Sequence, residues 1–242
     1  MQSMTALNHL WLPVPTNLTL LPNDVHIWRI HLDVPEAQQQ NLLATLSGDE
    51  LARANRFHFQ EHRQRFIAGR GILRSILGSY LGIEPQRVLF DYQERGKPVL
   101  ADSLAKSGLW FNLSHSQGLA LCAVNYHNRI GIDLEYIRRM SDVEALAKRF
   151  FLPREYDVVR SLSDHQQQEI FFRYWTCKEA YLKATGEGLA QLEQVEVLLN
   201  PTEPAQLQTS ESWSLFELRA AEDYFAAVVV EGSGCNLQCW QY

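Results

Sequence analysis

The sequence has few cysteines and no long apolar run, and these absences argue against two classes of protein. Its 242 residues include four cysteines, Cys122, Cys177, Cys235 and Cys239, and none of them forms a CxxC pair. A chain of this length does not need disulfides to fold, so we expect free thiols in a reducing compartment. No apolar run approaches the roughly 20 residues that span a bilayer. The N-terminal stretch lacks a basic region and contains several prolines, so we expect no signal peptide, no membrane partner and a cytoplasmic location.

Positive charge is also scarce. Lysine and arginine number 22 against 28 aspartates and glutamates, which gives a formal net charge of −6. Proteins that bind nucleic acid usually show the opposite balance, so we expect no nucleic-acid partner. An anionic ligand would have to be held by a local group of basic side chains. The apolar content of 46% is enough for one large domain or two small ones, and it disfavours a disordered chain.

Strand and helix patterns alternate along the whole chain and predict a mixed α+β fold. Residues 1–24 are expected to form an irregular arm. Strands are expected over residues 25–32, 88–92, 109–113, 119–126, 130–137, 195–199, 213–219 and 224–230. Helices are expected over residues 35–46, from Ser47, over 60–81 and 143–150, after Pro153, and over 168–185. Ser47, with Glu50 three residues on, is the expected cap of the second helix, and Gly82 and Gly186 are expected to end the two long helices. The polar stretch from His127 to Arg129 predicts a boundary, with one lobe over 1–126 and a second over 127–242.

Two carboxylates are expected side by side on the strand that opens the second half. Side chains alternate along a strand, so Asp133 and Glu135 lie on the same face while Ile132 and Leu134 lie on the other. Neighbouring carboxylates repel each other unless they are solvated or share a cation. Mg²⁺ is often bound by one or two carboxylates together with substrate phosphates. The alternative is a solvated pair on an edge strand, which the short motif alone favours.

The predicted helix 168–185 carries bulky apolar side chains on opposite sides, which indicates burial nearly all round. Glu179 and Lys183 are spaced i, i+4 beside Trp175 and Phe172. The alternative is an ordinary ion pair on a helix surface. A charged side chain in apolar surroundings requires a partner or a metal ion, so Glu179 and Lys183 are candidate functional residues.

Basic side chains cluster in one stretch of the first half. Arginines occur at positions 53, 56, 63, 65, 70 and 74, and those at 63, 70 and 74 are expected to form one stripe along a helix. Arginine binds phosphate through two parallel hydrogen bonds, so the cluster suggests an anion site. Ordinary solvated charge is the alternative. His58 and His62 have the spacing of a zinc pair, but no third ligand is evident.

A polar segment, Asn112 to Ser116, follows a predicted strand and is expected to form a turn. Its hydroxyl groups and imidazole would suit phosphate binding. A Ser114–His115 pair for nucleophilic catalysis is the rival interpretation, which is disfavoured because adjacent residues rarely point at each other. Lys97, in a turn predicted over residues 95–98, is a further candidate cation, although a solvated loop lysine is the simpler interpretation.

Three segments, in this order, resemble the signature motifs of the Sfp-type 4′-phosphopantetheinyl transferases. They are FNLSHS at 111–116, GIDLE at 131–135 and WTCKEAYLKATGEGL at 175–189. The chain length and the RGKP turn also match, and the sequence looks closest to cyanobacterial members. The resemblance extends from about residue 46 to 189 and more weakly to the end. It implies two similar α+β lobes in a pseudo-twofold arrangement, with coenzyme A between them.

The resemblance also implies roles for the acidic and basic residues of the second half. Asp133, Glu135 and Glu179 match the family's magnesium ligands. Glu179 also matches the residue proposed to assist deprotonation of the attacking serine. Lys183 matches the lysine that contacts the pyrophosphate of coenzyme A. Glu179 and Lys183 are therefore the expected catalytic residues.

The remaining implied contacts hold coenzyme A. Ser114 and His115 match contacts of the SHS motif, and Lys97 matches a lysine near the nucleotide phosphates. Arg53 and Arg56 fall in the segment that binds the 3′-phosphate. Within that segment the chain departs from the best-known members, because it has a glutamate at position 50 where they carry a lysine.

Together these features predict an enzyme that transfers the phosphopantetheine arm of coenzyme A to a serine of an apo carrier protein, with Mg²⁺ as cofactor. We expect a monomer, because two lobes in one chain can form the whole cleft. Two alternatives stay open from the residues alone. One is a Mg²⁺-dependent hydrolase of nucleotides or phosphate esters, and the other is a nucleotide-binding module without catalysis.

Overall fold

The two halves of the chain repeat one order of elements. The first half runs through β2 (Asp24–His31), α1 (Glu36–Leu43), α2 (Gly48–Ala54), α3 (Gln60–Leu81), η1 (Pro85–Arg87), β3 (Phe90–Tyr92), β4 (Pro98–Leu100), α4 (Asp102–Ala105), β5 (Leu109–Ser116) and β6 (Leu119–Tyr126). The second half runs through β7 (Ile130–Tyr136), α5 (Val143–Phe150), α6 (Pro153–Arg160), α7 (Asp164–Thr185), η2 (Leu189–Gln194), β8 (Glu196–Leu198), β9 (Gln206–Gln208), β10 (Trp213–Leu218) and β11 (Tyr224–Glu231). Apart from α4, each element of one half has a counterpart in the other.

The repeat extends to the sheets. The computed structural model describes residues 10–94, 96–200 and 203–242. In the first half β6 lies between β2 and β5, and in the second half β11 lies between β7 and β10, in both cases antiparallel. The long helices α3 and α7 each have 22 residues and each cover one sheet. The prediction of an α+β fold with two similar lobes is confirmed.

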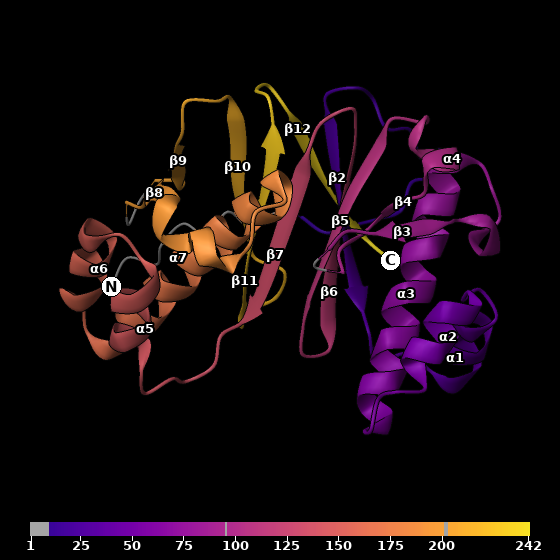
Figure 1. Ribbon diagram of the computed structural model, residues 1–242, viewed down its shortest axis with the longest axis horizontal. Coiled ribbons are helices and arrows are strands. Elements are labelled where there is room, and N and C mark those ends of the chain that lie inside the picture. The colour runs from indigo at the N-terminus through magenta and orange to yellow at the C-terminus, as the bar shows by residue number, and fades with distance from the viewer. Residues whose placement is uncertain (1–9, 95, 201–202) are drawn as a thin grey trace.

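The two sheets lie face to face in the centre, and the helices lie on the outside (Figure 1). Apolar side chains of β2 and β6 pack there against those of β7 and β11, including Ile27, Leu121, Ile132 and Val228. A second core lies between α3 and the first sheet, and a third lies between α7 and the second sheet. In this arrangement α7 covers the outward face of β7. Asp133 and Glu135 lie on that face, opposite Ala227 and Phe225 in the neighbouring strand β11.

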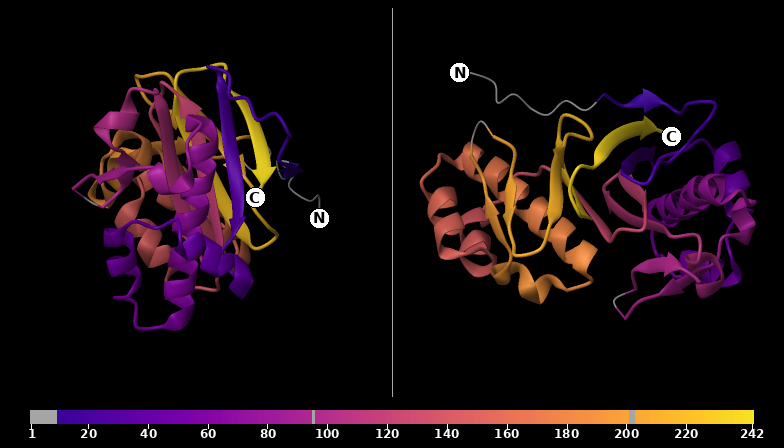
Figure 2. Two further views of the ribbon diagram at one scale, coloured as in Figure 1. Left: turned by 90° about the vertical axis from the view of Figure 1, so that its right-hand side faces the viewer. Right: turned by 90° about the horizontal axis from the view of Figure 1, so that it is seen from above.

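A strand that the sequence analysis did not predict joins the ends of the chain to the first lobe. β12 (Asn236–Gln241) leaves the second half and pairs in parallel with β2, and β1 (Leu12–Pro13) pairs with β12. Figure 2 shows this last strand, in yellow, lying against the first lobe. The five-stranded sheet therefore has the order β1-β12-β2-β6-β5. The division of the chain after residue 126 remains a prediction.

The helix ends follow local sequence signals. α3 and α7 both end at a glycine with a left-handed backbone, Gly82 at φ 64° and Gly186 at φ 83°, a conformation that other residues rarely adopt. α7 begins at Asp164, one turn before the predicted start.

Arg95 of the predicted turn and residues 1–9 of the predicted arm lie outside the described residues. Within the described ranges, none of the helices combines the length and the hydropathy required to cross a bilayer.

Candidate active site

Six of the predicted site residues line one pocket between the lobes. The pocket has a volume of about 390 Å³, and its walls come from β5, β7, α7 and the start of η2. The predicted residues in its lining are Ser114, His115, Asp133, Glu135, Glu179 and Lys183. Trp175 and the half-exposed Leu189 add apolar surface. The pocket therefore combines two carboxylates of β7 with a carboxylate and a lysine of α7, more than forty positions further along the chain.

A glycine on β7 brings α7 close enough for these residues to meet. A β-carbon at Gly131 would lie 2.1 Å from the backbone oxygen of Ala180 and 2.4 Å from the backbone nitrogen of Ala184. Such contacts are impossible, so the strand and the helix can pack at this distance only with glycine at position 131. Glu179 and Lys183 flank these two helix residues and are thereby held against Asp133.

We predict that Gly131→Ala lowers the free energy of unfolding by about 2–3 kcal/mol, because α7 must move away from β7 to admit the methyl group. Transfer activity should fall as well, since the same movement displaces Glu179 and Lys183. Thermal unfolding monitored by circular dichroism measures the first effect. Gly48→Ala is the matched control, because a β-carbon there meets no atom within 4 Å. Equal stability of the two variants would contradict this account of Gly131.

The SHS segment lies in a strand rather than in the predicted turn. Residues 111–116 belong to β5, and the turn follows at Gln117 and Gly118. Alternate side chains of β5 accept hydrogen bonds from the backbone of β7: Asn112 from Ile132 at 2.8 Å, Ser114 from Leu134 at 3.3 Å and Ser116 from Tyr136 at 3.1 Å. These side chains connect the two sheets where backbone pairing does not. Asn112 and Ser116 had not been assigned this role from the sequence.

Lys183 makes the shortest polar contact in the pocket. Its Nζ donates to Oδ1 of Asp133 at 2.6 Å and to Oγ of Ser114 at 3.1 Å. Ser114 in turn donates to the same oxygen of Asp133 at 3.1 Å. The other oxygen of Asp133, Oδ2, is buried and has no hydrogen-bond partner among the described residues. A buried carboxylate oxygen without a partner is costly, so it fits a ligand such as a cation.

The other two carboxylates of the pocket, Glu135 and Glu179, both have raised pKa values. Burial, and then the nearby charge of Asp133, raise the pKa of Glu179 to about 7. The same two causes raise the pKa of Glu135. With Lys183 on Asp133, the three acids do not form a coordination cage: in the described part of the chain no group of three or more histidine, cysteine, aspartate or glutamate side chains is arranged to hold a metal ion.

The raised pKa of Glu179 has a consequence for stability. A carboxyl whose folded pKa is about 7, against 4.5 normally, stabilises the fold below pH 4 and loses that contribution as the pH rises through 7. We predict that Glu179→Gln raises the melting temperature at pH 8 by a few degrees, equivalent to about 1 kcal/mol after allowance for partial exposure, and has little effect at pH 4. Melting curves without divalent cations measure this. The exposed Glu187→Gln is the control, and a lower melting temperature for Glu179→Gln at pH 8 would refute the expectation.

Lys97 reaches the site from the other lobe. It lies beside β4, and its Nζ donates to the backbone oxygen of Lys183 at 2.5 Å. Burial, together with the charge of Lys183, lowers the pKa of Lys97 to about 8. The hairpin of β3 and β4 is thus attached to the last turn of α7, although Lys97 does not line the pocket.

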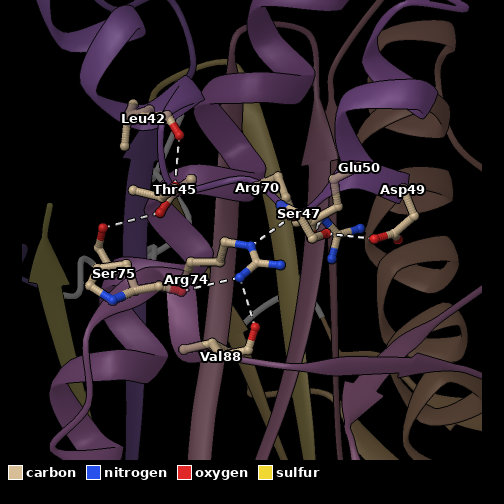
Figure 3. Close-up of polar contacts among 11 residues, drawn as sticks. Leu42, Thr45, Ser47, Asp49, Glu50, Arg70, Arg74, Ser75 and Val88 are labelled. Atoms are coloured by element: carbon tan, nitrogen blue, oxygen red, sulfur yellow. Dashed lines mark hydrogen bonds and ion pairs between the residues drawn. The ribbon is translucent and has the colours of Figure 1, made fainter.

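The predicted arginine stripe is not a single surface. Arg70 and Arg74 are buried and form ion pairs with the buried carboxylate of Glu50 (Figure 3). Arg74 also donates to the backbone oxygens of Pro85 and Val88. The interpretation of these two arginines as part of an anion site is therefore wrong, because both are buried inside the lobe and share the carboxylate of Glu50.

Glu50 itself has an internal role. Besides the two arginines, its Oε2 accepts the backbone N–H of Ser47 at 3.0 Å and so caps α2, as the sequence predicted. Arg53 and Arg56 remain exposed, at and just after the end of α2, and neither lines the carboxylate pocket. The structure brings six predicted residues together and leaves these two apart.

One residue of the third motif had no predicted role. Lys178 is fully buried, and its Nζ lies 2.5 Å from the buried carboxylate of Glu155 on α6. It also donates to the backbone oxygens of Leu192 and Val195, at 3.1 and 2.6 Å. A lysine next to Glu179 in a helix that is apolar on opposite sides is the sequence feature that could have indicated a buried, paired charge at position 178. Lys178 attaches α6 and η2 to α7 and so supports the wall that carries Leu189.

Comparison with known proteins gives consistent matches over both lobes. The model of the 4′-phosphopantetheinyl transferase superfamily matches residues 129–229, and that of the 4′-phosphopantetheinyl transferase N-terminal domain matches residues 34–127. The 4′-phosphopantetheinyl transferase HetI of Nostoc sp. is 67% identical over 236 residues, which cover 98% of this chain and 100% of that protein.

More distant relatives show the same similarity. The 4′-phosphopantetheinyl transferase Sfp of Bacillus subtilis is 29% identical, with coverage of 78% of this chain and 83% of that protein. The L-aminoadipate-semialdehyde dehydrogenase-phosphopantetheinyl transferase of Mus musculus is 28% identical, with coverage of 78% and 68%. The two-lobed fold, the three motifs at one pocket and these matches lead to one conclusion: the chain belongs to the 4′-phosphopantetheinyl transferase superfamily and is an enzyme of that kind.

Proposed function

We propose that this enzyme transfers the 4′-phosphopantetheine group of coenzyme A to a serine hydroxyl of an apo carrier protein, in the pocket between β5, β7 and α7. The observation that carries the proposal is the convergence on one pocket of residues from all three motifs: three carboxylates and a lysine from the second and third, and Ser114 and His115 from the first. A pyrophosphate and an incoming hydroxyl require such a combination of positive charge and a proton acceptor.

We further propose that Mg²⁺ binds to Asp133, Glu135 and Glu179. The unpartnered Oδ2 of Asp133 and the all-oxygen donor set fit a hard divalent cation. Side-chain rotations would have to bring the acids together, since they do not form a cage as they stand. When bound, the ion would neutralise the charge of the pyrophosphate and orient it.

In the proposed reaction the serine oxygen forms a bond to the phosphorus that bears the pantetheine arm, and the bond from that phosphorus to the bridging oxygen of the pyrophosphate breaks. Glu179 accepts the serine proton, for which its raised pKa suits it. Lys183 stabilises the charge that develops on the leaving 3′,5′-ADP. Ser114 and His115 hold the phosphates, and Lys97 supports the last turn of α7 from outside the pocket. Arg53 and Arg56 bind the 3′-phosphate from the exposed end of α2.

Intact mass measurement of a carrier protein tests the proposal. The enzyme is incubated with coenzyme A, Mg²⁺ and an apo carrier, and a gain of one phosphopantetheine with release of 3′,5′-ADP is expected. Release of nucleotide without a change in carrier mass would support the rival hydrolase. Absence of any product would leave only nucleotide binding and would contradict the proposal. Carriers from fatty-acid, polyketide, peptide and glycolipid synthases assayed in parallel would identify the preferred partner.

A further inference from the structure

The most deeply buried carboxylate of the pocket carries an internal positive charge. Asp133 is only 3% exposed, and the ammonium of Lys183 lies 2.6 Å from its Oδ1. No other lysine, arginine or histidine of the described residues forms an ion pair with Asp133. A carboxylate buried to this degree requires a counter-charge, and Lys183 supplies it.

Among the described residues, Lys183 is the one lysine or arginine that lines the pocket of the three acids. Glu135 and Glu179 line the same pocket, and neither has an ion pair of its own in the described part of the chain. Oδ2 of Asp133 remains without a hydrogen-bond partner. The negative charge is therefore only partly balanced, and a divalent cation would balance it better than one lysine does.

A divalent cation at Oδ2 of Asp133 and the ammonium of Lys183 at Oδ1 would each weaken the binding of the other. Two positive charges that share one buried carboxylate repel each other more strongly than they would in bulk water. The side chain of Lys183 is 29% exposed and has four rotatable bonds, so its ammonium can leave without disturbing α7. Its backbone oxygen stays fixed by Lys97.

We propose that Lys183 and the divalent cation compete for Asp133, so that the cation binds tightly only when a phosphate group is present to receive Lys183. This inference rests on the proposed function, because it takes the carboxylates as the metal site. It adds a coupling between the two ligands: coenzyme A tightens metal binding by removing the competitor, and the metal tightens coenzyme A binding by the same factor. Lys183 thus makes assembly of the site depend on the substrate.

Binding of Mn²⁺, as a probe of the metal site, tests the competition without any assay of transfer. Electron paramagnetic resonance counts the free ion in solutions of the full chain, with and without coenzyme A. Four proteins are compared: wild type, Lys183→Met, Lys97→Met and Asp133→Asn. Lys97→Met is the matched control, because it removes the same charge nearby but no contact to Asp133. Circular dichroism checks that each variant is folded, and Lys183→Gln replaces Lys183→Met if the latter is not.

Without coenzyme A, Lys183→Met is expected to bind Mn²⁺ about tenfold or more tightly than wild type, and Lys97→Met less than about threefold more tightly. Coenzyme A should tighten Mn²⁺ binding to wild type by about tenfold or more and to Lys183→Met much less. The competition is overturned if Lys183→Met binds Mn²⁺ no more tightly than wild type, or if Lys97→Met gains as much affinity as Lys183→Met. It is also overturned if neither wild type nor Lys183→Met binds Mn²⁺.

The Asp133→Asn variant separates this inference from the proposed function. Loss of Mn²⁺ binding in Asp133→Asn, together with an unchanged affinity of Lys183→Met, overturns the competition and leaves the proposed metal site intact. Binding to Asp133→Asn as tight as to wild type places the ion elsewhere and overturns both.

Discussion

Asp133→Asn is expected to reduce transfer to a carrier protein by about a thousandfold at saturating Mg²⁺ and coenzyme A. The substitution keeps the shape of the side chain but removes the charge that holds Lys183 and, in the proposed function, the metal. Asparagine can still accept a hydrogen bond from Ser114, so the junction of β5 and β7 should remain folded. The loss should therefore appear in kcat rather than in the amount of folded enzyme.

Turnover is measured by intact mass of the carrier at several Mg²⁺ concentrations, together with the melting temperature. Asp223→Asn is the matched control, since Asp223 is exposed in the turn between β10 and β11. Near-normal turnover of Asp133→Asn would contradict the assignment of the site. A collapse of the melting temperature would instead show that Asp133 serves mainly to join the lobes.

Lys178→Met is expected to lower the free energy of unfolding by about 3–5 kcal/mol. The substitution leaves the carboxylate of Glu155 buried without a counter-charge and removes the donor to two backbone oxygens. Burial already lowers the pKa of Lys178, against the opposing effect of Glu155, so this charge is tolerated only because of its partners. The melting temperature should fall by about 10 °C.

Two variants make this expectation specific. Lys148→Met, on the exposed side of α5, is the control and should change stability by less than about 0.5 kcal/mol. The double substitution Lys178→Met with Glu155→Met should cost less than the sum of the two single ones by about 1 kcal/mol or more, because no unpaired charge remains. Strict additivity would show that Lys178 and Glu155 do not act as a pair.

Local patterns in the sequence predicted the elements that carry the site. Alternation along residues 130–136 placed Asp133 and Glu135 on one face, and the apolar surroundings of Glu179 indicated a buried helix. The glycine after each long helix marked its end. The sequence also predicted the cap of α2 by Ser47 and Glu50. These features depend on residues within a few positions of each other, so chain geometry alone determines them.

Long-range partners were not predictable in the same way. The strand β12 carries a weak apolar pattern, and its pairing with β2 joins residues more than two hundred positions apart in the chain. The arginine stripe on α3 looked like a surface because periodicity does not reveal what a helix face meets. Glu50 on α2 decided that Arg70 and Arg74 lie inside the lobe.

The sequence by itself determined the family, the two-lobed α+β class and six of the residues that line the pocket. Only the tertiary structure decided which charges interact: Lys183 forms an ion pair with Asp133, the pKa of Glu179 is raised, and Lys178 forms an ion pair with Glu155. It also decided that side chains of β5 bind the backbone of β7. The physical reason is that the energy of a charge depends on its burial and on its neighbours in space, and both are set by packing between elements that are remote in the chain.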